Sequence, residues 1–215
     1  MRILAVGDIH GVYDKVRQLD SYFSKVDLVV FVGDYVDRGP QPIDVLNYCA
    51  SVPNSIRLVG NHEFAYLKKI RKEKRVFPEQ LTDRDFEAFK TALLNCVGDT
   101  RDKQRHYFKT EHVGISHAPA ALFQHDWDNV PFDRFFYGWV AGFDAEGKPI
   151  RMKLSEKYPG ETSDKPVIFG HIHSHVIDVE PNAYCVDLQC GKSDGNGQLG
   201  AVIIDDSTVV EKIII

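Results

Sequence analysis

Three short apolar runs in the first 63 residues each stop at a glycine that is followed by polar side chains. The runs cover residues 2–6, 27–32 and 55–59, and the residues that follow them are Gly7-Asp8, Gly33-Asp34 and Gly60-Asn61-His62. Short apolar runs that end at glycine are typical of buried strands. The sequence therefore predicts three strands that each end in a polar cluster.

Two segments with helical spacing separate these runs. In the first, apolar residues recur at Val12, Val16, Leu19 and Phe23, and the second covers residues 43–48. This spacing predicts amphipathic helices. Strands that alternate with helices predict a parallel sheet, and sites in such sheets lie at the carboxyl ends of the strands. We therefore expect the three polar clusters to meet at one edge of the sheet.

The rest of the chain is richer in strand signals. Apolar runs predict strands at residues 113–117, 167–171, 183–188, 201–204 and 208–215. Thr82 and Asp83 can cap a helix that runs through Leu94. We expect one domain, residues 1–215, with two sheets packed face to face and helices outside. A helical insertion is expected at about residues 64–112, and a substrate loop at about residues 138–166.

Charge and composition restrict the classes of partner. A net charge of −5 with 43% hydrophobic residues is ordinary for a soluble enzyme, and it offers no long-range attraction to nucleic acid or to a membrane. We therefore expect no stable nucleic-acid binding and no membrane association. The basic run at residues 68–75 is interpreted as a solvated helix face, with steering of an anionic substrate as the alternative. The oligomeric state is not predicted.

The cysteines and the first residues indicate the compartment. Four cysteines occur without a CxxC pair, which favours buried thiols in a reducing compartment over disulfides. The apolar start of the chain is too short for a signal peptide or a membrane span. We expect a cytoplasmic protein.

Five polar clusters each follow an apolar run, and together they supply carboxylates, imidazoles and an amide. They are residues 7–11, 33–39, 60–63, 116–118 and 170–173. Oxygen and nitrogen ligands of this kind suit manganese, iron or zinc, and no cysteine belongs to the set. An extended chain would place Asp8 with His10, and His171 with His173, on one side. A single cluster could equally cap a helix or line a turn, but the five together favour a metal site.

The five clusters resemble those of the calcineurin-like metallophosphoesterases. Gly-Asp-Tyr-Val-Asp-Arg-Gly at residues 33–39 and Gly-Asn-His-Glu at residues 60–63 are most similar to the phosphoprotein-phosphatase branch, which includes bacterial and phage Ser/Thr phosphatases and bis(5′-nucleosyl)-tetraphosphatases. The resemblance extends from residue 7 to about residue 191. It implies an α/β (α+β) fold of four layers, in which two mixed sheets form a central β-sandwich flanked by helices.

The resemblance also implies roles for individual residues. The first metal would be held by Asp8, His10 and Asp34, and the second by Asp34, Asn61, His117 and His171. Manganese is the metal expected first, and iron, zinc, nickel or cobalt would suit the same ligands. His62 would act as general acid, held by Asp37, and Arg38 would bind phosphate oxygens.

Three features depart from the usual pattern of the branch. Val59 stands where many protein phosphatases have an arginine, which weakens that interpretation and favours nucleotide-cleaving relatives. His173 stands where proline is usual, so it is expected as a further ligand of the first metal, with an outer or exposed histidine as the alternative. Arg151 is expected to reach the substrate, with Arg134 in reserve and a solvent-exposed arginine as the alternative.

The function expected first is a dinuclear-metal phosphoesterase that hydrolyses phosphomonoesters, including phosphoserine and phosphothreonine in proteins. A dinucleoside polyphosphate hydrolase is the alternative, because of Val59 and the segment at residues 137–151. A non-catalytic metal-binding scaffold is the second alternative. The presence of His62, Asp37 and Arg38 together argues against a scaffold, which would need no acid.

Overall fold

The larger sheet combines parallel and antiparallel strands. The computed structural model describes residues 1–98 and 106–215. Its larger sheet has the order β11-β12-β1-β2-β3, and β13 pairs with β12. These strands are β1 (Arg2–Val6), β2 (Leu28–Phe31), β3 (Ser55–Arg57), β11 (Asp187–Leu188), β12 (Gln198–Asp205) and β13 (Thr208–Ile214). The first three are parallel, as the sequence predicts, and β12 runs antiparallel to β1.

The second sheet is also mixed. Its order is β4-β5-β8-β10-β9, with β5, β8 and β10 parallel and the two edge strands antiparallel. The strands are β4 (Tyr107–Lys109), β5 (Gly114–Ser116), β8 (Val167–Phe169), β9 (Asp178–Glu180) and β10 (Ala183–Cys185). Both sheets have parallel strands whose carboxyl ends can supply a site.

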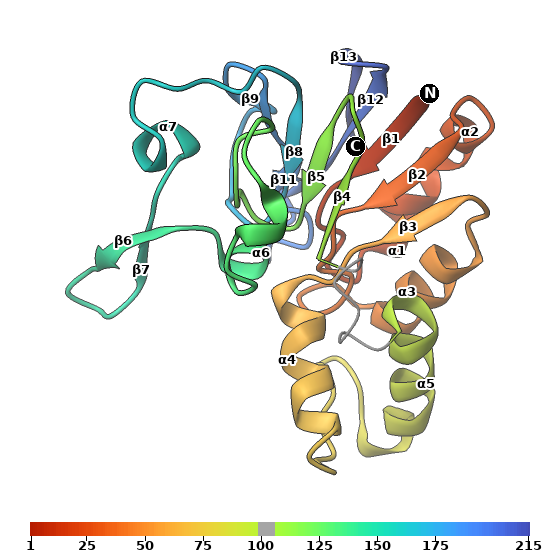
Figure 1. Ribbon diagram of the computed structural model, residues 1–215. Helices are drawn as coiled ribbons and strands as arrows, with labels where there is room; N and C mark the ends of the chain where they lie inside the picture. The colour runs from red at the N-terminus through yellow and green to blue at the C-terminus, as the bar shows by residue number, and fades with distance from the viewer. Residues whose placement is uncertain (99–105) are drawn as a thin grey trace.

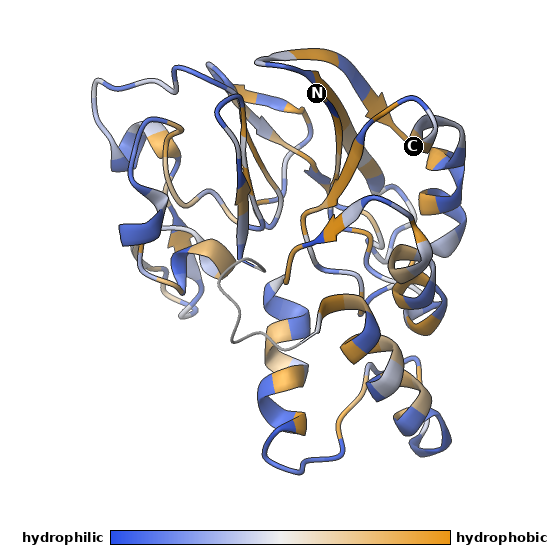
Figure 2. Cartoon of the chain, turned by 45° about the vertical axis from the view of Figure 1, so that its right-hand side comes forward, coloured by the Kyte–Doolittle hydropathy of each residue, from blue (hydrophilic) through white to orange (hydrophobic). Residues whose placement is uncertain are grey.

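Side chains that alternate along β1 bury both faces of the larger sheet. Ile3 and Ala5 pack with Ile115 and Ile168 of the second sheet, whereas Leu4 and Val6 pack against the helices. Trp127, Phe135 and Leu154 cover the outer face of the second sheet. The strands of the central region are mostly hydrophobic (Figure 2). The expected four-layer sandwich with flanking helices is confirmed.

Helices cover the outer face of the larger sheet (Figure 1). The segment expected as one helix after residue 12 consists of α1 (Tyr13–Val16), a 3-10 turn (Arg17–Leu19) and α2 (Asp20–Phe23). The next helix, α3 (Pro42–Ser51), begins with proline, whose missing N–H costs nothing in the first turn. The others are α4 (Asn61–Ile70) and α5 (Phe86–Val97), and a 3-10 turn at Asp83–Asp85 precedes α5.

The two expected additions contain secondary structure. Residues 64–112 include most of α4, all of α5 and the edge strand β4, while residues 99–105 lie outside the described residues. Residues 138–166 form a hairpin, β6 (Val140–Phe143) with β7 (Pro149–Arg151), followed by α7 (Leu154–Lys157). The hairpin extends away from the sheets and follows α6 (Arg134–Tyr137) (Figure 1).

All four cysteines are free thiols and are buried. In the described part of the chain, no helix has the length and apolar character needed to span a membrane.

Candidate metal centre

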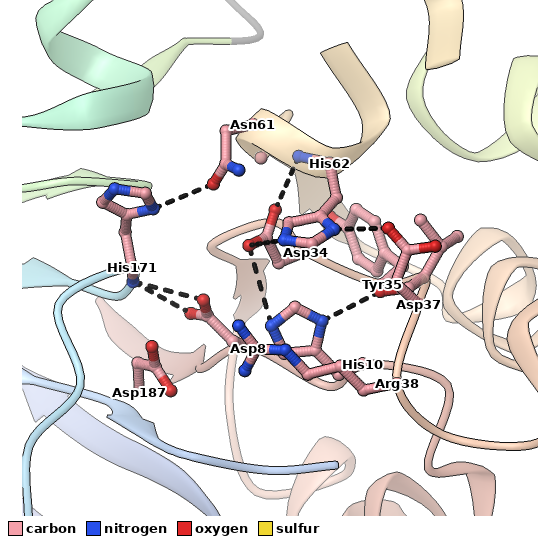
Figure 3. A network of polar contacts seen from close by, with 12 residues as sticks. Asp8, His10, Asp34, Tyr35, Asp37, Arg38, Asn61, His62, His171 and Asp187 are labelled. Atoms are coloured by element: carbon pink, nitrogen blue, oxygen red, sulfur yellow. Dashed lines mark hydrogen bonds and ion pairs between the residues drawn. The ribbon is translucent and has the colours of Figure 1, made fainter. Parts of the chain in front are cut away.

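Asp34 lies at the middle of the polar clusters, just after β2 (Figure 3). Its Oδ2 is 3.7 Å from Nε2 of His10, and its Oδ1 is 3.6 Å from Nε2 of His117. His10 follows β1 of the larger sheet and His117 follows β5 of the second sheet. Burial pushes the pKa of Asp34 up, but the imidazoles of His117, His62 and others outweigh it, so the pKa is lowered. One ionised carboxylate therefore faces imidazoles from both sheets.

The first group of possible metal ligands consists of His10, Asp34 and His62, whose ligand atoms all lie within 4.8 Å of one another. The resemblance implies a different third ligand for the first metal, because it gives Asp8, and not His62, together with His10 and Asp34. The Asp8 carboxylate instead accepts the amide of His171, with N–O distances of 3.2 and 3.4 Å. Burial, followed by repulsion from Asp187 and Asp34, raises the pKa of Asp8. A cation beside these carboxylates would remove that repulsion.

The second group consists of Asp34, His117 and His171, whose ligand atoms are also within 4.8 Å of one another. Asn61 completes it, because its Oδ1 is 3.0 Å from Nε2 of His117 and 2.8 Å from Nδ1 of His171. All four residues that the resemblance implies for the second metal thus point at one place, and Asp34 is shared with the first group.

His10 shows that the first group suits a cation. Burial lowers the pKa of His10 to about 4, so its ring is neutral. Its Nδ1 lies 2.9 Å from the carbonyl oxygen of Val36. A carbonyl oxygen can only accept a hydrogen bond, so the ring proton is assigned to Nδ1. Nε2 then presents a lone pair towards Asp34 and has no hydrogen-bond partner among the described residues. A metal ion between this nitrogen and the carboxylate would satisfy both.

The backbone that carries these side chains is unusual. His10, Asp34, Asp37, Arg38 and His171 all have positive φ angles, between 48° and 67°. Residues other than glycine rarely adopt this left-handed conformation, and such strain tends to gather at functional sites. The extended geometry assumed for Asp8-x-His10 and His171-x-His173 is wrong, because His10 and His171 lie in turns.

Glu63 holds the turn after β2 in place. Its carboxylate accepts the amides of Asp34 and Gly60 at 2.9 and 3.1 Å, and those of Tyr35 and Val36 at 2.9 and 3.3 Å. The Glu63 side chain is fully buried, so these four bonds replace its hydration. They also orient the loop from which Asp34 projects.

Two glycines leave room for the buried carboxylates. A Cβ atom at position 60 would lie 2.1 Å from Oδ1 of Asp34, and one at position 170 would lie 1.9 Å from Oδ1 of Asp8. Both positions therefore require glycine, since any larger residue would displace an acid of the centre. The groups that approach these glycines are side chains of the protein itself.

The ring of His62 is held in a fixed orientation by Asp37. Its Nδ1 makes a short hydrogen bond to Oδ2 of Asp37, and the Tyr66 hydroxyl donates to the other Asp37 oxygen at 2.7 Å. Burial lowers the pKa of His62, but Asp37 and Asp34 outweigh it and raise the pKa to about 9. The ring is thus protonated at neutral pH, with Nδ1 directed at Asp37 and Nε2 directed into the centre, 3.8 Å from Asp34.

The first 175 residues match the family model described as calcineurin-like phosphoesterase. This chain belongs to that family. Serine/threonine-protein phosphatase 2 of Escherichia coli is 46% identical over 65 residues, and the symmetrical bis(5′-nucleosyl)-tetraphosphatase of Salmonella paratyphi A is 41% identical over 71 residues. These matches cover 28% and 31% of the chain, and only 29% and 25% of the two relatives.

Solved structures of similar fold extend the likeness over the whole chain. A candidate diadenosine tetraphosphatase superposes with a TM-score of 0.67 and 20% identity, covering 100% of this chain and 92% of that one. A protein serine/threonine phosphatase from Saccharomyces cerevisiae superposes with a TM-score of 0.56 and 18% identity, covering 100% and 79%. At these identities the likeness shows the calcineurin-like phosphoesterase fold.

The structure places His173 apart from both ligand groups. Its side chain is 50% exposed, and its Nε2 lies 3.6 Å from Oδ2 of Asp187 and 3.4 Å from the guanidinium of Arg38. Its role as a ligand stays a prediction. Arg38 itself follows Asp37 in the same turn and faces the centre (Figure 3).

Arg151 lies at the end of the β6–β7 hairpin and makes a short hydrogen bond from Nη1 to the carbonyl oxygen of Tyr137. The Tyr137 ring is 6.2 Å from the ring of His171. Burial is the largest cause that lowers the pKa of His171, to about 2, and the charge of Arg151 contributes. Arg134 stacks on Trp139 instead, 5.0 Å from the ring centre. Arg151, and not Arg134, is therefore the loop arginine near the centre.

Sequence reasoning missed Asp187 and Tyr66, and it gave no individual role to Glu63, which lies in the cluster at residues 60–63. Asp187 is buried beside Asp8, and its Oδ2 has no hydrogen-bond partner among the described residues. Glu63 and Tyr66 orient Asp34 and Asp37. A lone acid in the apolar run at residues 183–188 was a signal for Asp187, since carboxylates are rarely buried without a partner. The roles of Glu63 and Tyr66 depend on a turn that no pattern reveals.

Proposed function

We propose that this protein hydrolyses phosphate monoesters at a centre of two metal ions, with His62 as the general acid. The observation that carries the proposal is the Asp34 carboxylate, which is shared by two groups of ligands beside a protonated His62. Two cations held by these groups would bind phosphate oxygens and lower the pKa of the attacking water. Mn is proposed as the metal because it accepts carboxylate, amide and imidazole ligands together.

The residues of the chain would supply positioning and a proton. The attacking water gives one proton to solvent and adds to phosphorus as hydroxide. As the bond to the leaving oxygen breaks, the proton on Nε2 of His62 passes to that oxygen, and the ring takes up a new proton from solvent before the next turnover. Nδ1 stays bonded to Asp37, so the ring keeps its orientation, and Asp37 stabilises the charge before transfer. Arg38 would bind phosphate oxygens on the opposite side of the centre from Asn61 (Figure 3).

Phosphoserine or phosphothreonine is the substrate proposed first, as the name of the Escherichia coli relative suggests. A dinucleoside polyphosphate is the second candidate. The position of Arg151 near His171 favours it, because this cation would contact a phosphate beyond the one being cleaved.

Turnover of phenyl phosphate with added Mn²⁺ tests the proposal, because its poor leaving group needs a proton. His62→Asn should lower kcat by about 10²–10⁴-fold while the protein still binds Mn²⁺, because general acid catalysis contributes that much. His175→Asn, which changes an exposed histidine, should leave both unchanged. Full activity in the His62 variant would reject His62 as the acid, and an inactive unmodified protein would reject the function.

A further inference from the structure

A groove of about 320 Å³ lies between α4, with the turn that follows it, and the end of α6. Phe64, Lys68, Lys69, Lys72 and Lys74 line it on the α4 side, and Tyr137 lines the other side. We call it the α4 groove. The basic run that the sequence interprets as a solvated face therefore borders a concave surface.

The α4 groove and the metal centre share one face of the same helix. Asn61, the first residue of α4, directs its amide into the centre. Ala65 and Lys68 follow it at spacings of four and seven residues, which places them on the Asn61 side of the helix. At 1.5 Å per residue, Lys68 lies roughly 10 Å along the helix from Asn61. Lys72 and Lys74 follow in the turn after α4, where the amide of each donates to the carbonyl oxygen of Lys69. An elongated ligand can reach both.

Tyr137 connects the opposite wall to the centre. Its ring lies 6.2 Å from the ring of His171, and its carbonyl oxygen accepts Arg151. Tyr137 therefore links the groove that the lysines line with Arg151 and with the second group of ligands.

The lysines of the α4 groove are not neutralised by the protein. No ion pair among the described residues involves Lys68, Lys69, Lys72 or Lys74, although Arg75 pairs with Asp83. All four side chains are exposed, and Glu73 is the single acid within residues 68–75. Like charges on neighbouring turns repel, and a bound polyanion would relieve this repulsion. Such a cluster is conspicuous in a chain with a net charge of −5.

We infer that the α4 groove binds a chain of phosphate groups that continues from the phosphate at the metal centre. This inference rests on the proposed function, because the centre sets where that chain begins. Lysine ammonium groups suit phosphate as point charges. A polyphosphate carries charge at every unit and on all its sides, whereas neighbouring side chains of an extended peptide point in opposite directions. The chain could belong to a nucleotide or to inorganic polyphosphate.

Calorimetric titration of the metal-free protein with sodium tripolyphosphate tests the groove separately from catalysis. Replacing both Lys68 and Lys72 by glutamine should weaken binding roughly 10-fold, since each removes a charge-assisted contact. The pair Lys25→Gln and Lys90→Gln removes two lysines outside the groove and should leave binding unchanged. Absence of binding, or equal weakening in both pairs, would overturn the inference.

Three ligands then identify the source of the chain. Diadenosine tetraphosphate that binds more tightly than tripolyphosphate, with the same loss in the Lys68/Lys72 variant, indicates a nucleotide. Equal binding indicates inorganic polyphosphate. If the Lys68/Lys72 variant loses affinity only for a phosphopeptide with acidic flanks, the groove binds a peptide, and the inference is contradicted. Turnover of p-nitrophenyl phosphate by the unmodified protein is measured separately. Its absence, with tripolyphosphate binding intact, would reject the proposed function and leave the groove standing.

Discussion

The metal centre and the α4 groove are both proposed to bind phosphate, yet they are built in opposite ways. Asp34, His10 and His117 are buried, and His10 and Asp34 lie in left-handed turns. The lysines of the groove are exposed, and no ion pair with another residue of the described part of the chain fixes their rotamers. The comparison teaches that a buried, pre-oriented group acts over a few ångströms with large effect, whereas exposed charges act weakly and depend on salt.

The largest effect is expected from Asp34→Asn, because this carboxylate belongs to both ligand groups. The variant should lose bound metal and lower turnover by well over about 100-fold, since even residues that only support ligands cost 10–100-fold. Metal content after dialysis and turnover measure this. Asp44→Asn, an exposed change in α3, should have no effect. If the Asp34 variant still binds a stoichiometric amount of metal, Asp34 is not a metal ligand.

Glu63→Gln should give the next largest effect, on stability. Two of the four backbone amides would face an NH₂ group in place of an oxygen, which should cost roughly 2–4 kcal/mol in the free energy of unfolding. Chemical denaturation of the metal-free protein measures the change. Glu87→Gln on the exposed side of α5 serves as the control and should change stability by less than about 0.5 kcal/mol. Equal effects would show that the turn does not depend on Glu63.

Asp37→Asn should shift the pH dependence of turnover. The acid must be protonated, so activity falls as pH rises through the pKa of His62, and Asp37 is a main cause that raises this pKa. Removing its charge should move the alkaline limb of the pH–rate profile down by about one unit or more. An upward or absent shift would contradict the assignment of His62 as the acid.

The smallest effect is expected from salt. Raising the ionic strength from about 0.05 to 0.5 M should weaken tripolyphosphate binding to the groove several-fold, because exposed charges are screened. Turnover of p-nitrophenyl phosphate at saturation should change less, since the buried centre is screened little. If ionic strength changed binding and turnover equally, the metal centre and the α4 groove would not differ in how strongly salt screens them.

The sequence predicted the parallel strands and the meeting of polar clusters at their carboxyl ends, because glycine and an acid interrupt each apolar run. It did not predict that His10, Asp34 and His171 adopt left-handed turns, since the surrounding loops impose that conformation. For the same reason the assumed extended pairs failed, and His173 lies near Asp187 instead of within a ligand group.

The outer segments were harder to predict than the core. Residues 138–166 contain a hairpin and a short helix. Polar and apolar side chains alternate too little along this segment for the sequence to predict either element. The helix expected from Val12 to Phe23 is broken into short pieces although its apolar spacing is regular. Periodicity reports which face is buried, but it does not report whether the backbone stays continuous.

Because Asp34 comes from the larger sheet and His117 and His171 from the second, cations bound between them would fasten the two halves of the sandwich together. Ligands that bind only the folded state raise the melting temperature. Thermal unfolding with and without a chelator would therefore show, without any substrate, whether metal is bound. It would also rank metals by how far each raises the melting temperature.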